Sequence, residues 1–256
     1  MKNCAVILAG GEGKRMKSDK PKTLSEVLGR PMLCWVMSAL RKAGIDDICV
    51  VKGFKKECVE EYLSTLDFSV ESVFQAERLG TGHAVMMAKD FLKKHSGNVV
   101  ILNGDAPFID ADTLRASLEL HTSSNSEVTV ITADIDDPQG YGRIIRSSGE
   151  FTAIREQKDC SPAEAEICEV NSGAYWFSAK ALLQTLPKLS TNNAAGEYYL
   201  TDCVEMMSRR QAYKSANPDI VLGANTRGAL LELNQLARLR KLSRLMDEGV
   251  SFITLD

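Results

Sequence analysis

The 256-residue sequence predicts an α/β fold, with a Rossmann-like, mostly parallel sheet flanked by helices and a smaller β-rich lobe. Three observations predict it. Short β-rich runs alternate with longer helix-like segments through the first half of the chain. Two of these runs, residues 6–8 and 99–102, are apolar without alternation, which is typical of central strands buried on both faces. After about residue 133 the β-like pieces become shorter, and this change indicates the second lobe.

The elements of the first half follow one another as strand, helix and strand. Runs rich in β-forming residues predict strands at residues 5–8, 48–51, 69–74, 98–102 and 127–132. Helix-like segments between the first four lie at residues 31–43, 55–66 and 80–93. Because parallel strands need a long crossover between them, usually a helix, this order predicts βαβ units.

The second half contains shorter elements. The β-like pieces at residues 142–146, 151–154 and 170–177 predict the second lobe, and helical signals return at residues 179–186 and 198–209. The last long segment, residues 227–247, has a helical pattern and is basic. The sequence shows no internal repeat, low-complexity tract or flexible linker, so one compact domain is the simplest interpretation.

The composition is that of an ordinary globular protein and disfavours several kinds of partner. The formal net charge is -3, so neither nucleic acid nor an anionic membrane is expected, because both favour a basic surplus. The sequence has no apolar run of the roughly 20 residues that a membrane helix needs, and its N-terminus shows no signal peptide. The seven cysteines include no CxxC pair, which favours reduced, buried thiols in a cytoplasmic protein.

The most informative stretch reads LAGGEGKRM over residues 8–16, directly after the first predicted strand. Gly10, Gly11 and Gly13 allow positive φ angles and a close ligand approach, so consecutive backbone N–H groups can surround phosphate oxygens. Arg15 and Lys22 add cationic donors nearby. The stretch matches neither the GxxxxGK[ST] phosphate loop nor the GxGxxG dinucleotide fingerprint. From the residues alone, a plain turn after a strand is the alternative interpretation.

Asp105 stands just beyond the buried strand predicted at residues 98–102. Ligands of open α/β sheets bind beyond the carboxyl ends of the strands, and a carboxylate there can hold magnesium, which prefers oxygen ligands. A helix N-cap is the alternative interpretation of this acidic stretch, since Asp110 or Asp112 could begin a helix equally well.

Several segments together resemble a known family. The glycine-rich stretch, with Pro-Lys at residues 21–22, is similar to its LAxGxGxRM…PK signature. QAERLGTGHA at residues 75–84 is similar to QxxxLGTxHA, and NGDAP at residues 103–107 to GDxP. Five further matches keep the family's order: YGR at 141–143, EQKD at 156–159, EVNSG at 169–173, GEYYLTD at 196–202 and GANTR at 223–227. The chain therefore resembles sugar-phosphate nucleotidylyltransferases, in particular the uridyltransferase domain of bacterial bifunctional enzymes that also acetylate glucosamine 1-phosphate.

The resemblance implies the nucleotide-diphospho-sugar transferase fold and the formation of UDP-N-acetylglucosamine and pyrophosphate from UTP and N-acetylglucosamine 1-phosphate, a step toward the peptidoglycan of the cell wall. It implies that Arg15, Lys22 and Asp105 are catalytic, and that Asp105 and Asn225 hold Mg²⁺. The substrate-binding residues that it implies are Leu8, Ala9, Gly10, Gly11, Lys22, Gln75, Gly80, Thr81, Asn103, Gly104, Gly142, Glu156, Asn171 and Asn225. Gln75 has the donor and acceptor groups to read a uracil edge, whereas Gly142, Glu156 and Asn171 would contact the sugar in the β-rich lobe.

Two other functions stay open. One is a related nucleotidylyltransferase that uses glucose 1-phosphate or another nucleotide, and the other is a non-catalytic subunit that keeps the nucleotide-sugar pocket. Asn103 stands where many members of the family carry an aromatic residue, so selectivity for the sugar and the base stays open too. The resemblance divides the chain into a nucleotidylyltransferase domain, residues 1–228, and a C-terminal helix and linker, residues 229–256. No hexapeptide-repeat domain follows in this sequence, and because that domain forms the trimer of the family, the oligomeric state also stays open.

Overall fold

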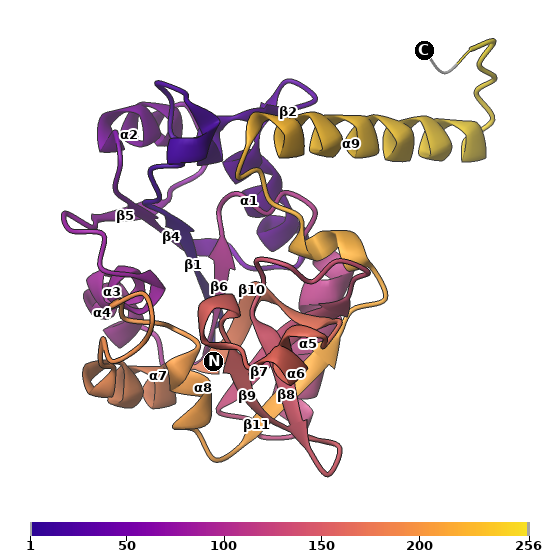
Figure 1. Cartoon of the computed structure of the whole chain (residues 1–256). Coiled ribbons are helices and arrows are strands. Elements are labelled where there is room, and N and C mark those ends of the chain that lie inside the picture. The colour runs from indigo at the N-terminus through magenta and orange to yellow at the C-terminus, as the bar shows by residue number, and fades with distance from the viewer. Residues whose placement is uncertain (1, 255–256) are drawn as a thin grey trace.

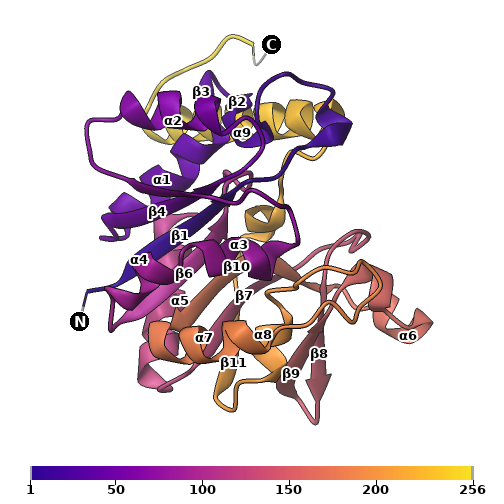
Figure 2. The same ribbon diagram turned by 90° about the vertical axis from the view of Figure 1, so that its left-hand side faces the viewer.

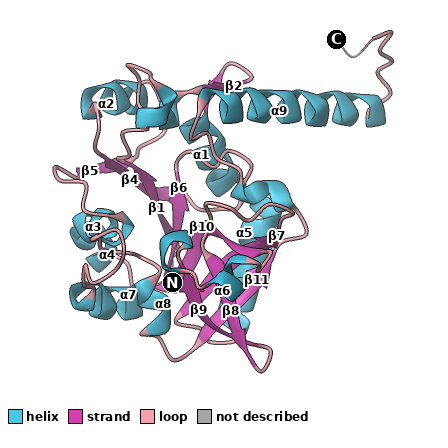
Figure 3. Ribbon diagram, viewed as in Figure 1, coloured by secondary structure: helices cyan, strands magenta, loops and turns pink. Residues whose placement is uncertain are grey.

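The computed structural model describes residues 2–254, which form three layers with helices on both faces of a central sheet (Figures 1 and 2). Figure 3 shows the strands gathered in the middle of the molecule and the helices outside them. The predicted α/β class is therefore confirmed. None of the described helices is long and apolar enough to cross a membrane.

The central sheet is mostly parallel. Its strands follow the order β11 (Arg210–Lys214), β7 (Val128–Asp134), β10 (Glu169–Ser178), β6 (Asn98–Asn103), β1 (Cys4–Ala9), β4 (Asp47–Lys52) and β5 (Glu71–Phe74). Strand β10 runs antiparallel to both of its neighbours, β6 and β7, whereas the other adjacent pairs along this order are parallel. The carboxyl ends of β1, β4 and β6 consequently lie at one edge of the sheet.

Apolar side chains of the strands alternate between two helical layers. Cys4 and Val6 of β1 face the layer that contains α3 (Thr81–Met87), α4 (Lys89–Lys93), α7 (Ala179–Thr185) and α8 (Asp202–Glu205). Ala5 and Ile7 face the layer that contains α1 (Met32–Lys42), α2 (Lys56–Ser64) and α5 (Ala111–Ser123). Because β1 is buried on both faces, its sequence lacks the alternation of a half-exposed strand.

The second lobe is a hairpin of β8 (Arg143–Ser147) and β9 (Glu150–Arg155), followed by α6 (Pro162–Ala165). In the described part of the chain, the hairpin pairs with the central sheet at one position, where Arg143 of β8 lies opposite Val170 of β10. The lobe is therefore an extension of the same sheet, joined to it through β10.

The last helix, α9 (Arg227–Asp247), packs on the domain through its N-terminal half and through Arg240, which pairs with Asp219 and lies over the ring of Phe108. Thr226 caps its first turn, and Leu233 and Ala237 are its buried side chains in a small cluster with Met16 and Phe108. The rest of α9 extends away from the body of the molecule (Figure 1). The first half of α9 contacts the two-stranded sheet of β2 (Glu26–Val27) and β3 (Arg30–Pro31), where Asn234 donates to the carbonyl of Glu26. The predicted division at residue 228 falls inside the first turn of this helix, and it stays a prediction.

Two predicted helices differ from the structure. The segment predicted at residues 80–93 is two helices, because Ala88 leaves helical geometry with φ −84° and ψ 9°. The segment predicted at residues 198–209 keeps only α8. Tyr198 donates its N–H to Leu79 and accepts from Gly82 through its carbonyl, so these groups do not form the bonds of a helix. Strand β11 was not predicted, since it is a half-exposed edge strand with few apolar residues.

Short 3-10 helices connect the longer elements, at η1 (Lys14–Met16), η2 (Lys22–Leu24), η3 (Gln157–Asp159), η4 (Leu186–Lys188) and η5 (Pro218–Val221). The seven cysteines are free thiols, of which Cys4, Cys49 and Cys203 are buried. Cys168 is exposed, so the expectation of buried thiols holds for only part of the set.

Candidate active site

The glycine-rich loop and the segment that carries Asp105 meet where two neighbouring strands end. Leu8 of β1 lies opposite Asn103 of β6 in the parallel register. The N–H of Gly104 donates to the carbonyl of Leu8 over 2.9 Å, and this bond carries the pairing beyond the last residue of β6. Because parallel strands end at the same edge, this pairing brings the two segments together.

Lys22 connects the two segments to the start of α9. Its Nζ lies 2.5 Å from Oδ2 of Asp105 and 3.1 Å from Oδ1 of Asn225. The side chains of Lys22 and Asp105 are only 18% and 12% exposed, so the ion pair is poorly screened by water. The structure thus brings together three predicted site residues that are up to 203 positions apart in sequence.

The same two oxygens are suitable ligands for a divalent cation. Because Asp105 Oδ2 and Asn225 Oδ1 both reach one ammonium group, they converge on one point from different segments. Carboxylate and amide oxygens are ligands that Mg²⁺ accepts. The described residues contain no group of three or more His, Cys, Asp or Glu side chains that could hold a metal alone. Further ligands would therefore come from substrate phosphates and water, as is usual for Mg²⁺.

The glycines of the loop let it pack against functional side chains. Gly13 has φ +62°, and a Cβ there would lie 2.9 Å from Cβ of Lys22. A Cβ on Gly10 would lie 3.0 Å from Oε1 of Gln75. Any larger residue at these positions would displace the neighbouring side chain, so the loop needs glycine for both conformation and space.

One compartment of the cleft, with a volume of about 240 Å³, lies on the side of the glycine-rich loop. It is lined by Leu8, Gly10, Gly11, Lys22, Gln75, Arg78, Gly80, Thr81, Ala84, Asn103, Asp105 and Glu197. Gln75 is 5% exposed, and its Nε2 donates to the carbonyl of Gly80 over 3.2 Å. Nδ1 of His83 lies 3.2 Å from the same nitrogen. His83 therefore orients the Gln75 amide, which fits an ordering role for this histidine.

The wall of this compartment at residues 79–82 is bound to a distant segment. Backbone hydrogen bonds of 2.8 Å join Leu79 and Gly82 to Tyr198. Oγ1 of Thr81 accepts from the N–H of Leu200 over 3.1 Å. Gly80 has φ +109°, and a Cβ there would lie 2.6 Å from the carbonyl oxygen of Tyr198. The predicted residues Gly80 and Thr81 thus depend on residues 198–200 for their placement.

The second compartment has a volume of about 350 Å³ and shares Leu8, Lys22, Thr81, Asn103 and Asp105 with the first. Its other lining residues are Ala106, Gly140, Tyr141, Gly142, Glu156, Asn171, Ser172, Gly173, Tyr175, Leu200, Thr201, Val221, Gly223 and Asn225. The three residues predicted to contact a sugar therefore meet in one cavity, next to the Lys22–Asp105 ion pair.

Glu156, which follows β9, carries a shifted pKa in this compartment. Burial raises the pKa of its carboxyl, and the nearby charges of Asp159 and Asp202 raise it further. A hydrogen bond from Oγ1 of Thr201 to Oε1, at 3.0 Å, acts in the opposite direction without cancelling the shift. Hydroxyl donors from a ligand would stabilise the charged carboxylate, as further hydrogen bonds to it do.

Asn171 is oriented by its own strand. Its Oδ1 accepts from the N–H of Gly173 over 2.9 Å, and its Nδ2 lies 2.5 Å from the hydroxyl of Tyr175. Its backbone N–H donates to the carbonyl of Gly142 over 2.8 Å, which joins β10 to the second lobe. Asn103 packs against Gly173, where a Cβ would lie 2.1 Å from its Nδ2. Glycine at position 173 thus makes room for the side chain of Asn103, the residue that differs from the aromatic one in many members of the family.

Two predicted residues take other places. Arg15 is exposed on η1 and lines neither compartment, so the structure does not bring its side chain to Asp105. Ala9 is buried in the core, so only its backbone is near the loop. The lining residues Tyr141, Thr201 and Gly223 were not predicted individually, although each lies in a segment that matches the family. A separate groove of about 330 Å³ between α1 and α9 contains none of the predicted site residues.

Comparison with known proteins places this geometry in context. The family model described as "Nucleotidyl transferase" matches residues 4–219. "Bifunctional protein GlmU" from Clostridium tetani (strain Massachusetts / E88) is 44% identical over 257 residues, which cover 99% of this chain and 56% of that protein. The protein of the same name from Clostridium novyi (strain NT) shows the same identity and coverage. The chain thus spans about half the length of the curated relatives that it matches.

A solved structure shares the fold. The crystal structure from Bacillus anthracis described as a glucose-1-phosphate thymidylyltransferase in complex with a sucrose superposes with a TM-score of 0.77. The match covers 99% of this chain and 98% of that one, at 23% sequence identity. At this identity, the similarity shows the fold alone.

Proposed function

The chain belongs to the nucleotidyl transferase family, and on this premise we propose that it joins UTP to N-acetylglucosamine 1-phosphate, forming UDP-N-acetylglucosamine and pyrophosphate. One observation carries the proposal. Two compartments meet at the Lys22–Asp105 ion pair. We call the one beside the glycine-rich loop the nucleotide compartment and the one at the β-rich lobe the sugar compartment. A reaction that joins a nucleotide to a sugar phosphate needs this arrangement.

The proposed reaction is a direct phosphoryl substitution. A phosphate oxygen of the sugar phosphate attacks the α-phosphorus of UTP, and a new P–O bond forms between them. The bond from the α-phosphorus to the bridging oxygen breaks, and pyrophosphate leaves with that electron pair. The attacking phosphate is already anionic near neutral pH, so no general base is required.

The main obstacle to this reaction is repulsion between two polyanions. Two unit charges 4 Å apart repel by about 4 kcal/mol at an effective dielectric constant of 20, and these substrates carry several charges. Lys22 supplies a largely buried positive charge at the junction of the compartments. Gly10 and Gly11 line the compartment beside the glycine-rich loop, where their backbone N–H groups would donate to phosphate oxygens. Preorganised donors of this kind stabilise the transition state without reorganising during the reaction.

We propose Mg²⁺ as the cofactor, held by Asp105 and Asn225, because an oxygen of each contacts the same cationic group, the ammonium of Lys22. When bound, the ion would neutralise phosphate charge at the reacting centre. Asp105 and Asn225 would orient the phosphates by holding that charge in place. Lys22, at the junction of the two compartments, would bind a phosphate oxygen.

Selectivity comes from the two compartments. Gln75 Oε1 faces Gly10, where it can accept a hydrogen bond from the N–H group of a uracil. Glu156 and Asn171 can bind sugar hydroxyls and an acetamido group. The choice of N-acetylglucosamine over glucose rests on the sequence resemblance around EVNSG and GEYYLTD. Because UTP is a cytoplasmic substrate, we propose that the enzyme acts in the cytoplasm and supplies cell-wall synthesis.

A pyrophosphate-release assay tests the proposal. Nucleoside triphosphates and sugar 1-phosphates are combined in a panel, with and without magnesium. We expect the highest rate with UTP and N-acetylglucosamine 1-phosphate, and only in the presence of the ion. A higher rate with glucose 1-phosphate or another nucleotide would identify a related enzyme. No turnover with any pair, together with nucleotide-sugar binding, would identify a non-catalytic subunit.

A further inference from the structure

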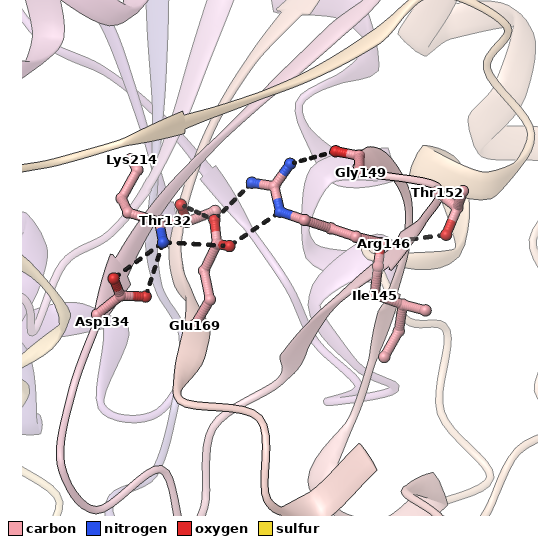
Figure 4. Close-up of polar contacts among 8 residues, drawn as sticks. All are labelled: Thr132, Asp134, Ile145, Arg146, Gly149, Thr152, Glu169 and Lys214. Atoms are coloured by element: carbon pink, nitrogen blue, oxygen red, sulfur yellow. Dashed lines mark hydrogen bonds and ion pairs between the residues drawn. The ribbon is translucent and has the colours of Figure 1, made fainter. Parts of the chain in front are cut away.

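Figure 4 shows a cluster of polar and charged side chains on the strands, and none of them lines the sugar compartment. At the centre of the cluster is Glu169 on β10, whose side chain is 10% exposed. Its partners are Arg146 from β8, Thr132 from β7 and Lys214 from β11. We call these four residues the Glu169 clamp. The mechanism above uses none of them.

The carboxylate of Glu169 is bound on both oxygens. Arg146 donates to Oε2 through Nε over 3.0 Å and to Oε1 through Nη2 over 2.8 Å, which is a two-point contact. Oγ1 of Thr132 donates to Oε1 over 2.8 Å, and Nζ of Lys214 lies 3.5 Å from Oε2. Lys214 is held in turn by both oxygens of Asp134, each at 2.9 Å. A planar guanidinium that meets a carboxylate at two points fixes orientation as well as distance.

The charge state of Glu169 follows from these contacts. Burial alone would raise the pKa of its carboxyl, but the hydrogen bonds from Arg146 and Thr132, together with the positive charges of Arg146 and Lys214, hold the pKa below its usual value. Glu169 is therefore ionised at neutral pH. Separating Arg146 from Glu169 would leave the buried carboxylate without its counter-ion. This cost keeps the two side chains together.

The second lobe is also held by apolar packing, since Ile144, Phe151 and Ile154 are buried in the core cluster of the sheet. The clamp adds a directional polar contact to this packing. In the described part of the chain, β8 and β10 share one register pair, Val170 with Arg143. Gly142 comes immediately before β8, and Glu156 comes immediately after β9. Asn171 lies on β10, two residues beyond Glu169, so side-chain alternation puts the two on the same face. A rotation of the hairpin about β10 would therefore move Gly142 and Glu156 relative to Asn171.

We propose that the Glu169 clamp positions the sugar compartment, with Arg146 and Glu169 acting as positioning residues that fix the second lobe against β10. This inference rests on the proposed function, since it assigns the sugar phosphate to that compartment. The clamp touches no substrate, and it acts through Gly142 and Glu156. The nucleotide compartment is formed by other segments, so its geometry does not depend on the clamp.

The test compares Michaelis constants for the two substrates in Glu169→Gln and Arg146→Lys. Glutamine keeps the shape but loses the charge, and lysine keeps the charge but loses the two-point contact. We expect Glu169→Gln to raise KM for the sugar phosphate about tenfold, as loss of one charge-assisted hydrogen bond predicts, with KM for UTP changed less than about twofold. Arg146→Lys should also raise KM for the sugar phosphate, but by less. This variant provides the test if Glu169→Gln fails to fold.

A control variant removes an exposed ion pair elsewhere on the same sheet. Glu71→Gln on β5 removes a carboxylate that binds Lys94 through both oxygens, at 3.0 and 2.8 Å, and it lines neither compartment. We expect both Michaelis constants to stay unchanged in this variant. The double variant Glu169→Gln/Arg146→Lys should be no worse than the more impaired single variant, because both substitutions break one contact.

The outcomes distinguish this proposal from the proposed function. If the wild-type protein does not transfer uridylate from UTP to the sugar phosphate, the proposed function is refuted before any variant is compared. If the wild-type protein is active, but the Glu169 and Arg146 variants raise both Michaelis constants equally or leave both unchanged, the positioning role of the clamp is refuted. The proposed function would still stand. Additive effects in the double variant would also overturn the positioning role.

Discussion

His121 is the group whose protonation we expect to weaken the fold in mild acid. It lies on α5, is 2% exposed, and its Nδ1 is 2.9 Å from Oγ1 of Thr129 on β7. Its Nε2 is buried and has no hydrogen-bond partner among the described residues. Burial lowers the pKa of His121 from 6.5 to about 4, because a protonated imidazole there would be a buried charge without a counter-ion.

The sign and size of the effect follow from these two pKa values. Between pH 6.5 and pH 4 the unfolded chain binds the proton and the folded chain does not, so the free energy of unfolding falls as the pH falls. The contribution of neutral His121 is fully present above pH 6.5 and is lost by about pH 4. From pH 7 to pH 5 the expected loss is about 2 kcal/mol, out of a total of about 3 kcal/mol.

Urea unfolding at pH 7 and pH 5 measures this loss. The comparison is with His121→Gln, which does not titrate and keeps a polar group near Thr129. Carboxylates and the other histidines are the same in both proteins, so their contribution to the pH dependence cancels. We expect the wild-type protein to lose about 2 kcal/mol more than the variant between the two pH values. Equal losses in both proteins would show that burial of this imidazole does not control stability in acid.

Two predictions concern the cleft. Asp105→Asn should lower kcat/KM by about a hundredfold or more, since it removes the one charged ligand proposed for magnesium, while the thermal unfolding midpoint stays within a few degrees. Near-normal magnesium-dependent pyrophosphate release would contradict the metal assignment. Lys22→Ala should lower turnover with UTP by about a hundredfold, because it removes a cation at the junction of the compartments, and it should change the melting temperature far less. An unchanged rate would remove Lys22 from the proposed site.

The sequence predicted the features that depend on local pattern. Continuous apolar runs identified β1 and β6, and helical periodicity identified α1 and α9 to within a residue or two. The glycine-rich loop was predicted to be a close-approach turn, and the structure places its glycines against Lys22 and Gln75. These features are readable because neighbouring residues specify them, through alternation, helical period and glycine conformation.

The tertiary structure decided which side chains from distant segments come into contact. Residues 198–200 read as helical, but backbone groups of Tyr198 and Leu200 bind residues 79–82 instead. Arg15 belongs to the matched signature, yet its side chain lies outside both compartments. The partnership of Glu169 with Arg146 and Lys214 has no local signal, because each residue comes from a different strand.

By itself the sequence determined the α/β class, the order of most elements and many of the residues that line the cleft. Only the tertiary structure decided that Lys22 bridges Asp105 and Asn225, and that a salt-bridged cluster ties the second lobe to the sheet. The physical reason is the range of the forces. Backbone conformation responds to nearby residues, whereas ion pairs and cavities depend on chain segments that only the folded sheet brings into contact.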